Sequence, residues 1–256
     1  MVSHGYVLPT RGIAIQSDSP LSLSSNTATL LTLASHAESS NFSSLWVGDS
    51  ILTRHRLEPL TTLASIAALT KKVQIGTAIY LLHLRHPVHV AHATATLDQL
   101  SNGRFIFGIG VGTSHESTIN ESRNLGIPFS ERGAILNESL DVIRKLWRGE
   151  NVSSTGFYPF HNAHLDIPPT REPPIYMATT KFDPKSGFSN SIQKRIEQHA
   201  DGLMPQTSPS KYSSMISHAR DLVEKSERST SLIATNYTDV VIASSEEEAF
   251  SQARDY

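Results

Sequence analysis

Residues 98–112 read DQLSNGRFIFGIGVG, and this stretch decides the fold. It predicts the end of a helix, a glycine-bearing turn, a buried strand and an exit rich in glycine. The strand, Phe105–Ile109, is a continuous apolar run, as a strand covered on both faces requires. Gly108, Gly110 and Gly112 remove side chains where the strand leaves the sheet, so that another group can approach the backbone closely. In α/β enzymes this is where ligands usually bind.

Size and composition restrict the class of protein. A chain of 256 residues suits one large α/β domain. The net charge is −2 with no block of like charges, so neither nucleic acid nor an anionic membrane is an expected partner. The chain has no cysteine, which excludes disulfides and thiol catalysis. No apolar run reaches the roughly 18 residues of a membrane span, so we expect a soluble, cytoplasmic protein.

Strand-like and helix-like segments alternate along the whole chain. This alternation predicts parallel strands joined by right-handed crossovers. It favours a TIM-type (β/α)8 barrel that stops short of its final strand–helix unit, as a single domain over residues 1–256 with a surface insertion around 151–173. The expected strands are Tyr6–Leu8, Ser44–Val47, Val73–Tyr80, Phe105–Ile109, Pro174–Ala178, Gly202–Met204 and Val240–Ala243. The expected helices are Thr27–Ser40, Pro59–Thr70, Pro87–Leu100, one with Leu136 to Trp147 on one face, Ser191–His199, Tyr212–Lys225 and one from Ser245.

The carboxyl ends of barrel strands meet on one face, where we look for the functional site. The residues there carry little charge, several hydroxyls and exposed backbone amides, which can hold a phosphate or a flat polar ring without a metal. The candidate catalytic residues are Asp49 and Ser50. The candidate ligand-binding residues are Thr77, Ala78, Ile79, Gly110, Gly112, Thr113, Ser114, Ala178 and Thr179, and the family resemblance described below implies that they bind a cofactor.

Each candidate also has a purely structural interpretation. Asp49 could polarise a bound ligand, or it could simply cap a loop. The turn at 110–114 could hold a phosphate or only form a tight strand exit. Arg104 lies at the entry of its strand, where an ion pair with Asp98 is a better explanation than catalysis.

Four histidines recur at every third position, namely His83, His86, His89 and His92. This spacing rotates them around a helix, so they cannot all converge, and no carboxylate completes a metal motif. We therefore expect no metal site.

Several motifs occur in one order along the chain: Leu45-Trp46-Val47-Gly48-Asp49, Leu57-Glu58-Pro59-Leu60-Thr61-Thr62-Leu63-Ala64, Ile75-Gly76-Thr77-Ala78, Leu84-Arg85-His86-Pro87, the opening stretch, and Pro128-Phe129 followed by Glu131-Arg132-Gly133. Together they resemble the bacterial luciferase-like flavin monooxygenases, and most of all their branch of deazaflavin (coenzyme F420) oxidoreductases. The resemblance is dense over residues 40–178.

The resemblance implies a barrel with a flavin ring at its carboxyl-terminal mouth. It implies a non-prolyl cis peptide at Ala78–Ile79 behind the ring, a tail- or phosphate-binding turn at Gly110–Ser114 and a second contact near Ala178–Thr180. Coenzyme F420 is the favoured cofactor and FMN the alternative. The deazaflavin branch commonly has a histidine where this chain has Ser50, so chemistry that depends on that histidine is not expected here.

The resemblance therefore implies a flavin-dependent oxidoreductase or monooxygenase that transfers hydride to, or oxygenates, a small organic substrate. Substrate specificity would lie in the 114–130 and 151–173 loops. The alternative is a non-catalytic flavin-binding or assembly protein derived from the same family. Because an unclosed barrel leaves strand edges exposed, we expect a homodimer or a truncated sequence.

Overall fold

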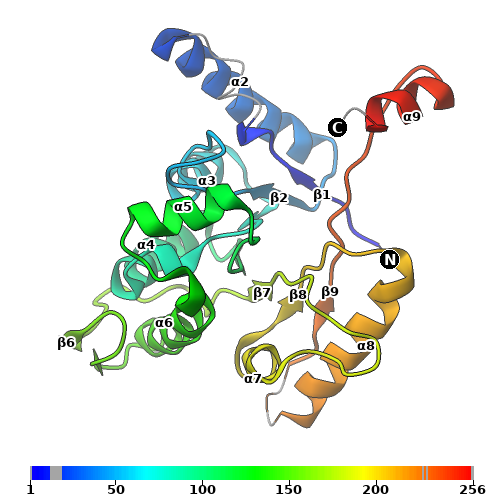
Figure 1. The fold of residues 1–256 in the computed structure, drawn as a ribbon. Coiled ribbons are helices and arrows are strands. Elements are labelled where there is room, and N and C mark those ends of the chain that lie inside the picture. Colours follow the sequence, from blue (N-terminus) through cyan, green and yellow to red (C-terminus); the bar gives the residue numbers. More distant parts are fainter. Residues whose placement is uncertain (1, 12–18, 227, 229, 255–256) are drawn as a thin grey trace.

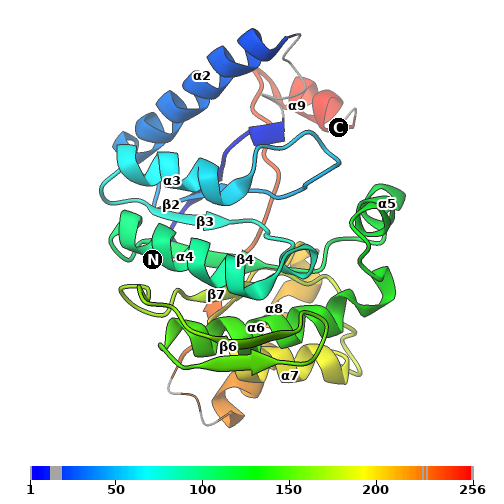
Figure 2. The ribbon, with the colours of Figure 1, turned by 90° about the vertical axis from the view of Figure 1, so that its left-hand side faces the viewer.

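The protein is described by a computed structural model over residues 2–11, 19–226, 228 and 230–254. These residues form an α/β fold in which one curled parallel sheet is covered on its outer face by helices (Figures 1 and 2). In the view of Figure 1 the carboxyl ends of the strands point toward the reader, and α5 lies in front.

Seven strands lie side by side in the order in which they occur along the chain. All neighbouring strands are parallel, and within the described residues no pairing joins the last strand to the first. The described chain therefore forms a half-barrel of the kind predicted, without ring closure. The strands are β1 (Gly5–Val7), β2 (Ser44–Val47), β3 (Gln74–Thr77), β4 (Phe105–Ile109), β7 (Ile175–Met177), β8 (Gly202–Leu203) and β9 (Ile233–Ala234).

The helices lie between successive strands, as the alternating pattern predicted. Proline occupies the first turn of α3 and α4, where its fixed φ suits a helix start and its missing N–H costs nothing. The helices are α2 (Pro20–Ser39), α3 (Pro59–Leu69), α4 (Pro87–Ser101), α5 (Glu116–Asn124), α6 (Arg132–Trp147), α7 (Asn190–His199), α8 (Pro209–Lys225) and α9 (Glu246–Arg254), with 3-10 turns η1 (Leu82–Leu84) and η2 (Phe129–Glu131).

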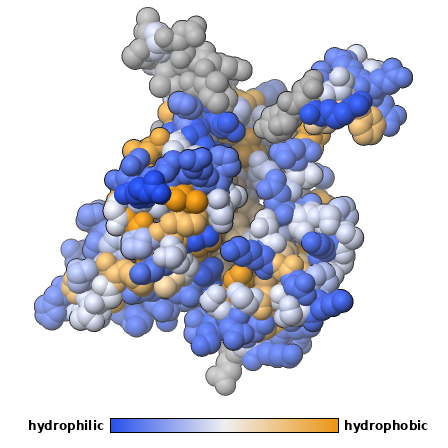
Figure 3. Space-filling model, in the orientation of Figure 1, coloured by the Kyte–Doolittle hydropathy of each residue, from blue (hydrophilic) through white to orange (hydrophobic). Residues whose placement is uncertain are grey.

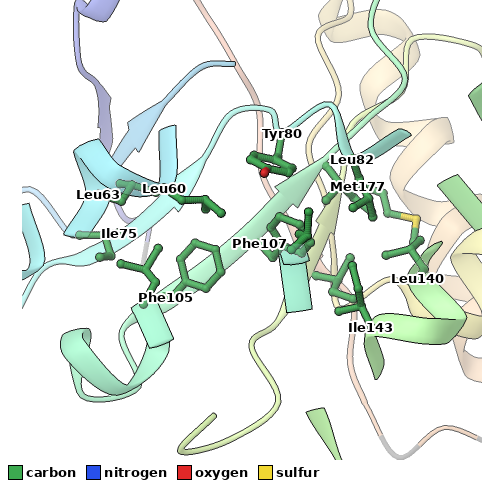
Figure 4. Packing of buried hydrophobic residues seen from close by; sticks show 14 of the residues in the cluster. Leu60, Leu63, Ile75, Tyr80, Leu82, Phe105, Phe107, Leu140, Ile143 and Met177 are labelled. Carbon is green, nitrogen blue, oxygen red and sulfur yellow. The ribbon is translucent and has the colours of Figure 1, made fainter. Parts of the chain in front are cut away.

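The main core lies between the outer face of the sheet and the helices (Figure 4). Leu45, Ile75 and Phe105 stand opposite one another on β2, β3 and β4 and are fully buried. Leu63 of α3 and Phe107 of β4 belong to the same cluster. Burial of each such side chain stabilises the fold by roughly 1.5–3 kcal/mol.

A second cluster fills the inner face of the sheet. It consists of Trp46, Ile106, Tyr176 and Met204, which we call the inner cluster. Alternation along each strand sends these side chains inward while their neighbours face the helices. Gly76 stands between Trp46 and Ile106 in the register, and a Cβ on it would lie 2.4 Å from the Trp46 ring. The narrow interior is therefore packed with side chains and is not an open channel.

Two expectations from the sequence are corrected by the structure, and a third segment contains more regular structure than expected. The predicted strand Val240–Ala243 is not a strand; Ile233–Ala234 pairs with β8 instead, and Val240 and Ile242 are exposed. The stretch after β4 contains α5, which the sequence analysis treated as part of a loop. The insertion at 151–173 carries an antiparallel hairpin, β5 (Val152–Ser154) and β6 (Phe160–Ala163), lying beside α6 in Figure 2.

The expected Arg104–Asp98 ion pair is also wrong. The Arg104 guanidinium donates to the carbonyls of Ala67, Thr70 and Val73, at 2.9–3.1 Å, and so closes the carboxyl end of α3 against β4. Asp98 accepts instead from the backbone N–H and the hydroxyl of Thr170. Arg104 prefers carbonyls because the helix end offers several unpaired ones.

Candidate functional site at the carboxyl-terminal mouth

The backbone at the end of β3 contains a cis peptide bond between Ala78 and Ile79, as the family resemblance implied. Both residues pack against the inner cluster, although alternation would send only one of them inward. Tyr80 then rejoins β4 through a bridge to Ile109. The carbonyl of Gly108 accepts hydrogen bonds from the Thr77 hydroxyl, at 2.6 Å, and from the Tyr80 N–H, at 2.7 Å. Strand β4 thus clamps the bulge on both sides.

The bulge forms part of an apolar surface at the mouth. Val7, Ala78, Ile79 and Ala178 are partly buried hydrophobic residues that pack on the inner cluster, and we call them the apolar floor. They come from the carboxyl ends of β1, β3 and β7, so they lie on the face that Figure 1 presents. Figure 3 shows this face hollowed at its centre, between the elements beside α5 and those beside α8.

Gly108 within β4 and Gly110 directly after it leave room for the bulge. A Cβ on Gly108 would lie 1.8 Å from the Thr77 carbonyl oxygen, and one on Gly110 would lie 2.3 Å from Cδ1 of Ile79. The group that approaches these two glycines is therefore strand β3 itself. Gly112 has φ of +68°, a conformation that favours glycine, and turns the chain toward α5.

Asp49 faces away from the mouth. Its side chain is fully buried on the outer side of β2, where its carboxylate accepts two hydrogen bonds from Arg85, at 2.7 and 2.9 Å, and one from the Leu81 N–H, at 2.9 Å. Arg85 in turn lies 4.4 Å above the Tyr80 ring. Asp49 therefore fixes the segment that follows the cis bond, a positioning contact on the outer side of the sheet.

Ser50 is tied to α5 through a residue that the sequence analysis did not single out. The buried carboxylate of Glu121 accepts hydrogen bonds from the Ser50 hydroxyl, at 3.0 Å, and from the N–H groups of Ile51 and Leu52, at 2.6 and 2.8 Å. This contact joins the loop after β2 to the helix after β4, two segments that border the mouth. Glu121 lies in a polar stretch of sequence with no motif, so only the fold reveals it.

The remaining candidates lie at the edge of the mouth. Thr113 and Ser114 are exposed between β4 and α5, and Thr179 is half-buried after β7, where its hydroxyl accepts from the Lys181 N–H at 3.2 Å. Their role in holding a cofactor stays a prediction.

Among the described residues, no group of three or more His, Cys, Asp or Glu side chains is arranged to hold a metal ion. His83 is fully buried in η1, and burial, followed by the charges of Arg132 and Arg85, lowers its pKa to about 4. His86 caps α4 by accepting from the Val88 N–H. Nor does any helix in the described part of the chain have the length and hydropathy to cross a membrane.

Arg56 is the second residue that sequence reasoning missed. Alternation along β2 directs the side-chain position of Gly48 inward, one layer above Trp46. A Cβ on Gly48 would lie 1.4 Å from Nη1 of Arg56. The guanidinium therefore occupies the inner face of β2 at the mouth.

Comparison with known proteins agrees with this geometry. An F420-dependent glucose-6-phosphate dehydrogenase of Amycolatopsis mediterranei is 34% identical over 190 residues, which are 69% of this chain and 57% of the relative. The chain thus spans little more than half the length of that relative. Among solved structures, the monooxygenase RslO1 of Streptomyces bottropensis superposes with a TM-score of 0.81 at 23% identity, over 99% of this chain and 76% of the other.

A third neighbour is the FMN-bound oxygenating constituent of 3,6-diketocamphane monooxygenase from Pseudomonas putida, with a TM-score of 0.74 at 17% identity, over 99% of this chain and 71% of the other. The model of the family described as luciferase-like monooxygenase matches residues 4–256. With the half-barrel and the cis bulge in place, the chain belongs to the luciferase-like monooxygenase family.

Proposed function

We propose that the protein binds a flavin-type cofactor on the apolar floor and acts as a flavin-dependent oxidoreductase on a small organic molecule. The observation that carries this proposal is the apolar floor at the mouth, on which the neighbouring residues Ala78 and Ile79 both lie. A flat aromatic ring needs such a surface, because it buries its face against apolar atoms and keeps its polar edge toward hydrogen-bonding groups.

The residues present fit such a ring. Gly110 leaves room for Ile79 beside Ala178, and the floor carries no charged side chain that a ring would have to desolvate. The floor would exclude water from one face of the ring, while the backbone after β4 and β7 would contact its polar groups. When bound, coenzyme F420 supplies hydride transfer, and reduced FMN supplies oxygen activation.

Coenzyme F420 is our favoured cofactor, with FMN as the alternative. The name of the relative at 34% identity specifies F420, whereas the camphane monooxygenase structure contains FMN. The Ser50 hydroxyl donates a hydrogen bond to Glu121 and is not an acid at neutral pH, so proton transfer would fall to another group or to the substrate. We assign Asp49 to positioning the bulge.

The similar proteins are named as dehydrogenases and monooxygenases, which supports an oxidoreductase over the non-catalytic flavin-binding alternative. Dimerisation and cytoplasmic localisation both stay predictions. Analytical ultracentrifugation of the purified protein tests whether it forms a homodimer.

The function is tested by fluorescence titration with F420 and with FMN on a matched pair of variants. Ala178→Asp puts a carboxylate on the floor, and Ala134→Asp makes the same change at an exposed site on α6. We expect Ala178→Asp to weaken the preferred flavin at least tenfold, about 1.4 kcal/mol, and Ala134→Asp to leave it unchanged. Equal affinities in the two variants would exclude the floor as the flavin site. Tight binding without turnover over a substrate panel would favour the non-catalytic alternative.

A further inference from the structure

A guanidinium faces inward at the mouth, next to the apolar floor. Nη1 of Arg56 occupies the space that a side chain at position 48 would take, directly above the Trp46 layer. The loop that carries it is bent at Arg54 and His55, which have φ of +62° and +45°. Two successive residues in the left-handed region are uncommon without glycine, so the loop is shaped to turn Arg56 back over the sheet.

This guanidinium has no partner of its own within the described residues. It makes no hydrogen bond or ion pair there, and its Nε is buried without an acceptor. The nearby carboxylate of Asp49 is fully used by Arg85 and Leu81 and faces the other side of β2. Arg56 is half-buried, and a guanidinium nitrogen that has lost water without gaining an acceptor is costly, so such groups are normally paired.

The surroundings of Arg56 make a bound anion favourable. Arg11, Arg54 and the phenol of Tyr237 all lie close enough to Arg56 to act on its charge electrostatically. Burial, followed by the charge of Arg54, holds the pKa of Arg56 below its ordinary value. An anion placed here would relieve the repulsion among three arginines, which Tyr237 and Asp49 offset only in part.

We propose that Arg56 is an oxyanion-binding residue, which holds the carboxylate or phosphate group of a ligand bound at the mouth. The inference rests on the proposed function, since the ligand is either the flavin-type cofactor or its substrate. A guanidinium suits this task because its planar fork donates two parallel hydrogen bonds to a carboxylate or phosphate. Arg11 and Arg54 add long-range attraction for the same group.

The test measures the binding of inorganic phosphate to the protein by isothermal titration calorimetry at low ionic strength. Wild-type protein should bind phosphate, Arg56→Gln should bind it at least tenfold more weakly, and Arg220→Gln, at an exposed site on α8, should match the wild type. Equal phosphate affinity in wild type and Arg56→Gln, or no binding to the wild type, would overturn the proposal.

A pair of flavins identifies the source of the anion. FMN and riboflavin differ only in a phosphate group. If Arg56 holds the cofactor's phosphate, Arg56→Gln weakens FMN and leaves riboflavin unchanged. If Arg56 instead holds a substrate group, both flavins bind Arg56→Gln as tightly as the wild type, and the flavin-loaded wild type still binds phosphate. The cofactor outcome and the substrate outcome both support an oxyanion site at Arg56.

Two controls keep this proposal separate from the flavin site and from misfolding. If the protein binds phosphate through Arg56 but binds no flavin, the proposed function is overturned and the oxyanion site at Arg56 stands. If Arg56→Gln fails to fold, the Nε–H resonance of Arg56 in wild-type protein, assigned by its loss in Arg56→Lys, should shift on phosphate addition. An unchanged resonance would contradict the proposal.

Discussion

Asp49 and Arg85 form a two-bond ion pair on the outer side of the sheet, with Oδ2–Nη1 at 2.7 Å and Oδ1–Nη2 at 2.9 Å. The pair connects the end of β2 to the segment after the cis bond, and the Leu81 N–H completes it. Its position explains how a carboxylate can hold the backbone of the proposed flavin site without facing the mouth.

Replacing Asp49 by Asn should destabilise the fold strongly, because it leaves the half-buried Arg85 charge without its partner. We expect a loss of about 3 kcal/mol in the free energy of unfolding, the usual cost of breaking a buried pair. Urea unfolding measures it, with Asp239→Asn at an exposed position as the control. A loss no larger than that of the control would show that the pair does not hold this segment.

Gly108→Ala should be far more harmful than a glycine substitution elsewhere. The new Cβ would lie 1.8 Å from the Thr77 carbonyl oxygen, which is backbone and cannot move without breaking the clamp on the bulge. We expect a loss of about 3 kcal/mol, the upper range for overpacking. Gly133→Ala in α6 meets nothing closer than 3.5 Å and should be neutral or stabilising by about 0.5–1 kcal/mol. Similar unfolding curves for the two variants would contradict this account of β4.

Glu121→Ala should loosen the loop after β2. Three donors lose their acceptor, namely the Ser50 hydroxyl and the N–H groups of Ile51 and Leu52. Hydrogen exchange of the two amides should accelerate at least tenfold, and the protein should lose about 2 kcal/mol of stability. The same change at the exposed Glu116 of α5 should leave both amides protected. Unchanged exchange in Glu121→Ala would mean that the loop is held by other contacts.

His83 should make stability depend on pH. Its pKa is about 4 in the folded protein, because of burial, against 6.5 for an ordinary histidine. Above pH 6.5 both states hold it neutral. As the pH falls from 6.5 to 4, the unfolded state gains a proton that the folded state refuses, so stability is lost progressively, by about 3 kcal/mol at most.

This contribution is measured as the difference between wild type and His83→Leu in urea unfolding at pH 7.5, 5.5 and 4.5. The leucine variant should lack that part of the pH dependence, whereas His164→Leu, at an exposed site, should follow the wild type. Parallel pH curves for wild type and His83→Leu would show that the buried imidazole is protonated without cost.

The sequence predicted the regular elements well where local signals were strong. Phe105–Ile109 and Ser44–Val47 are strands with the expected bounds, because apolar runs and their flanking turn residues fix them locally. The strand prediction for Val240–Ala243 was wrong. Its β-branched residues favour a strand, but a strand needs a neighbour to pair with, and the place beside β8 is taken by Ile233–Ala234.

The place of the candidate residues in the fold was predictable, but their contacts were not. Strand order put Asp49, Ala78 and Ile79 near the mouth, and the cis bond followed from the family resemblance. Asp49 is two residues after Val47 and four after Leu45, so alternation along the strand sends its side chain to the same outer face as theirs. This is a local signal that strand-end position alone does not contain. Glu121 contacts a loop far away in the sequence, and Arg56 contacts Gly48 across a turn. No spacing in the sequence reveals either contact.

The central claim is that a flavin-type ring binds on the apolar floor, and the most direct test is a crystal structure of the protein with F420 or FMN, whichever binds more tightly. The account predicts ring density in van der Waals contact, within roughly 4 Å, of Ala78 and Ile79. The contradicting result is ring density elsewhere, for example in the 380 Å³ surface cavity between α3 and α4 that Glu58, Tyr80 and His89 line.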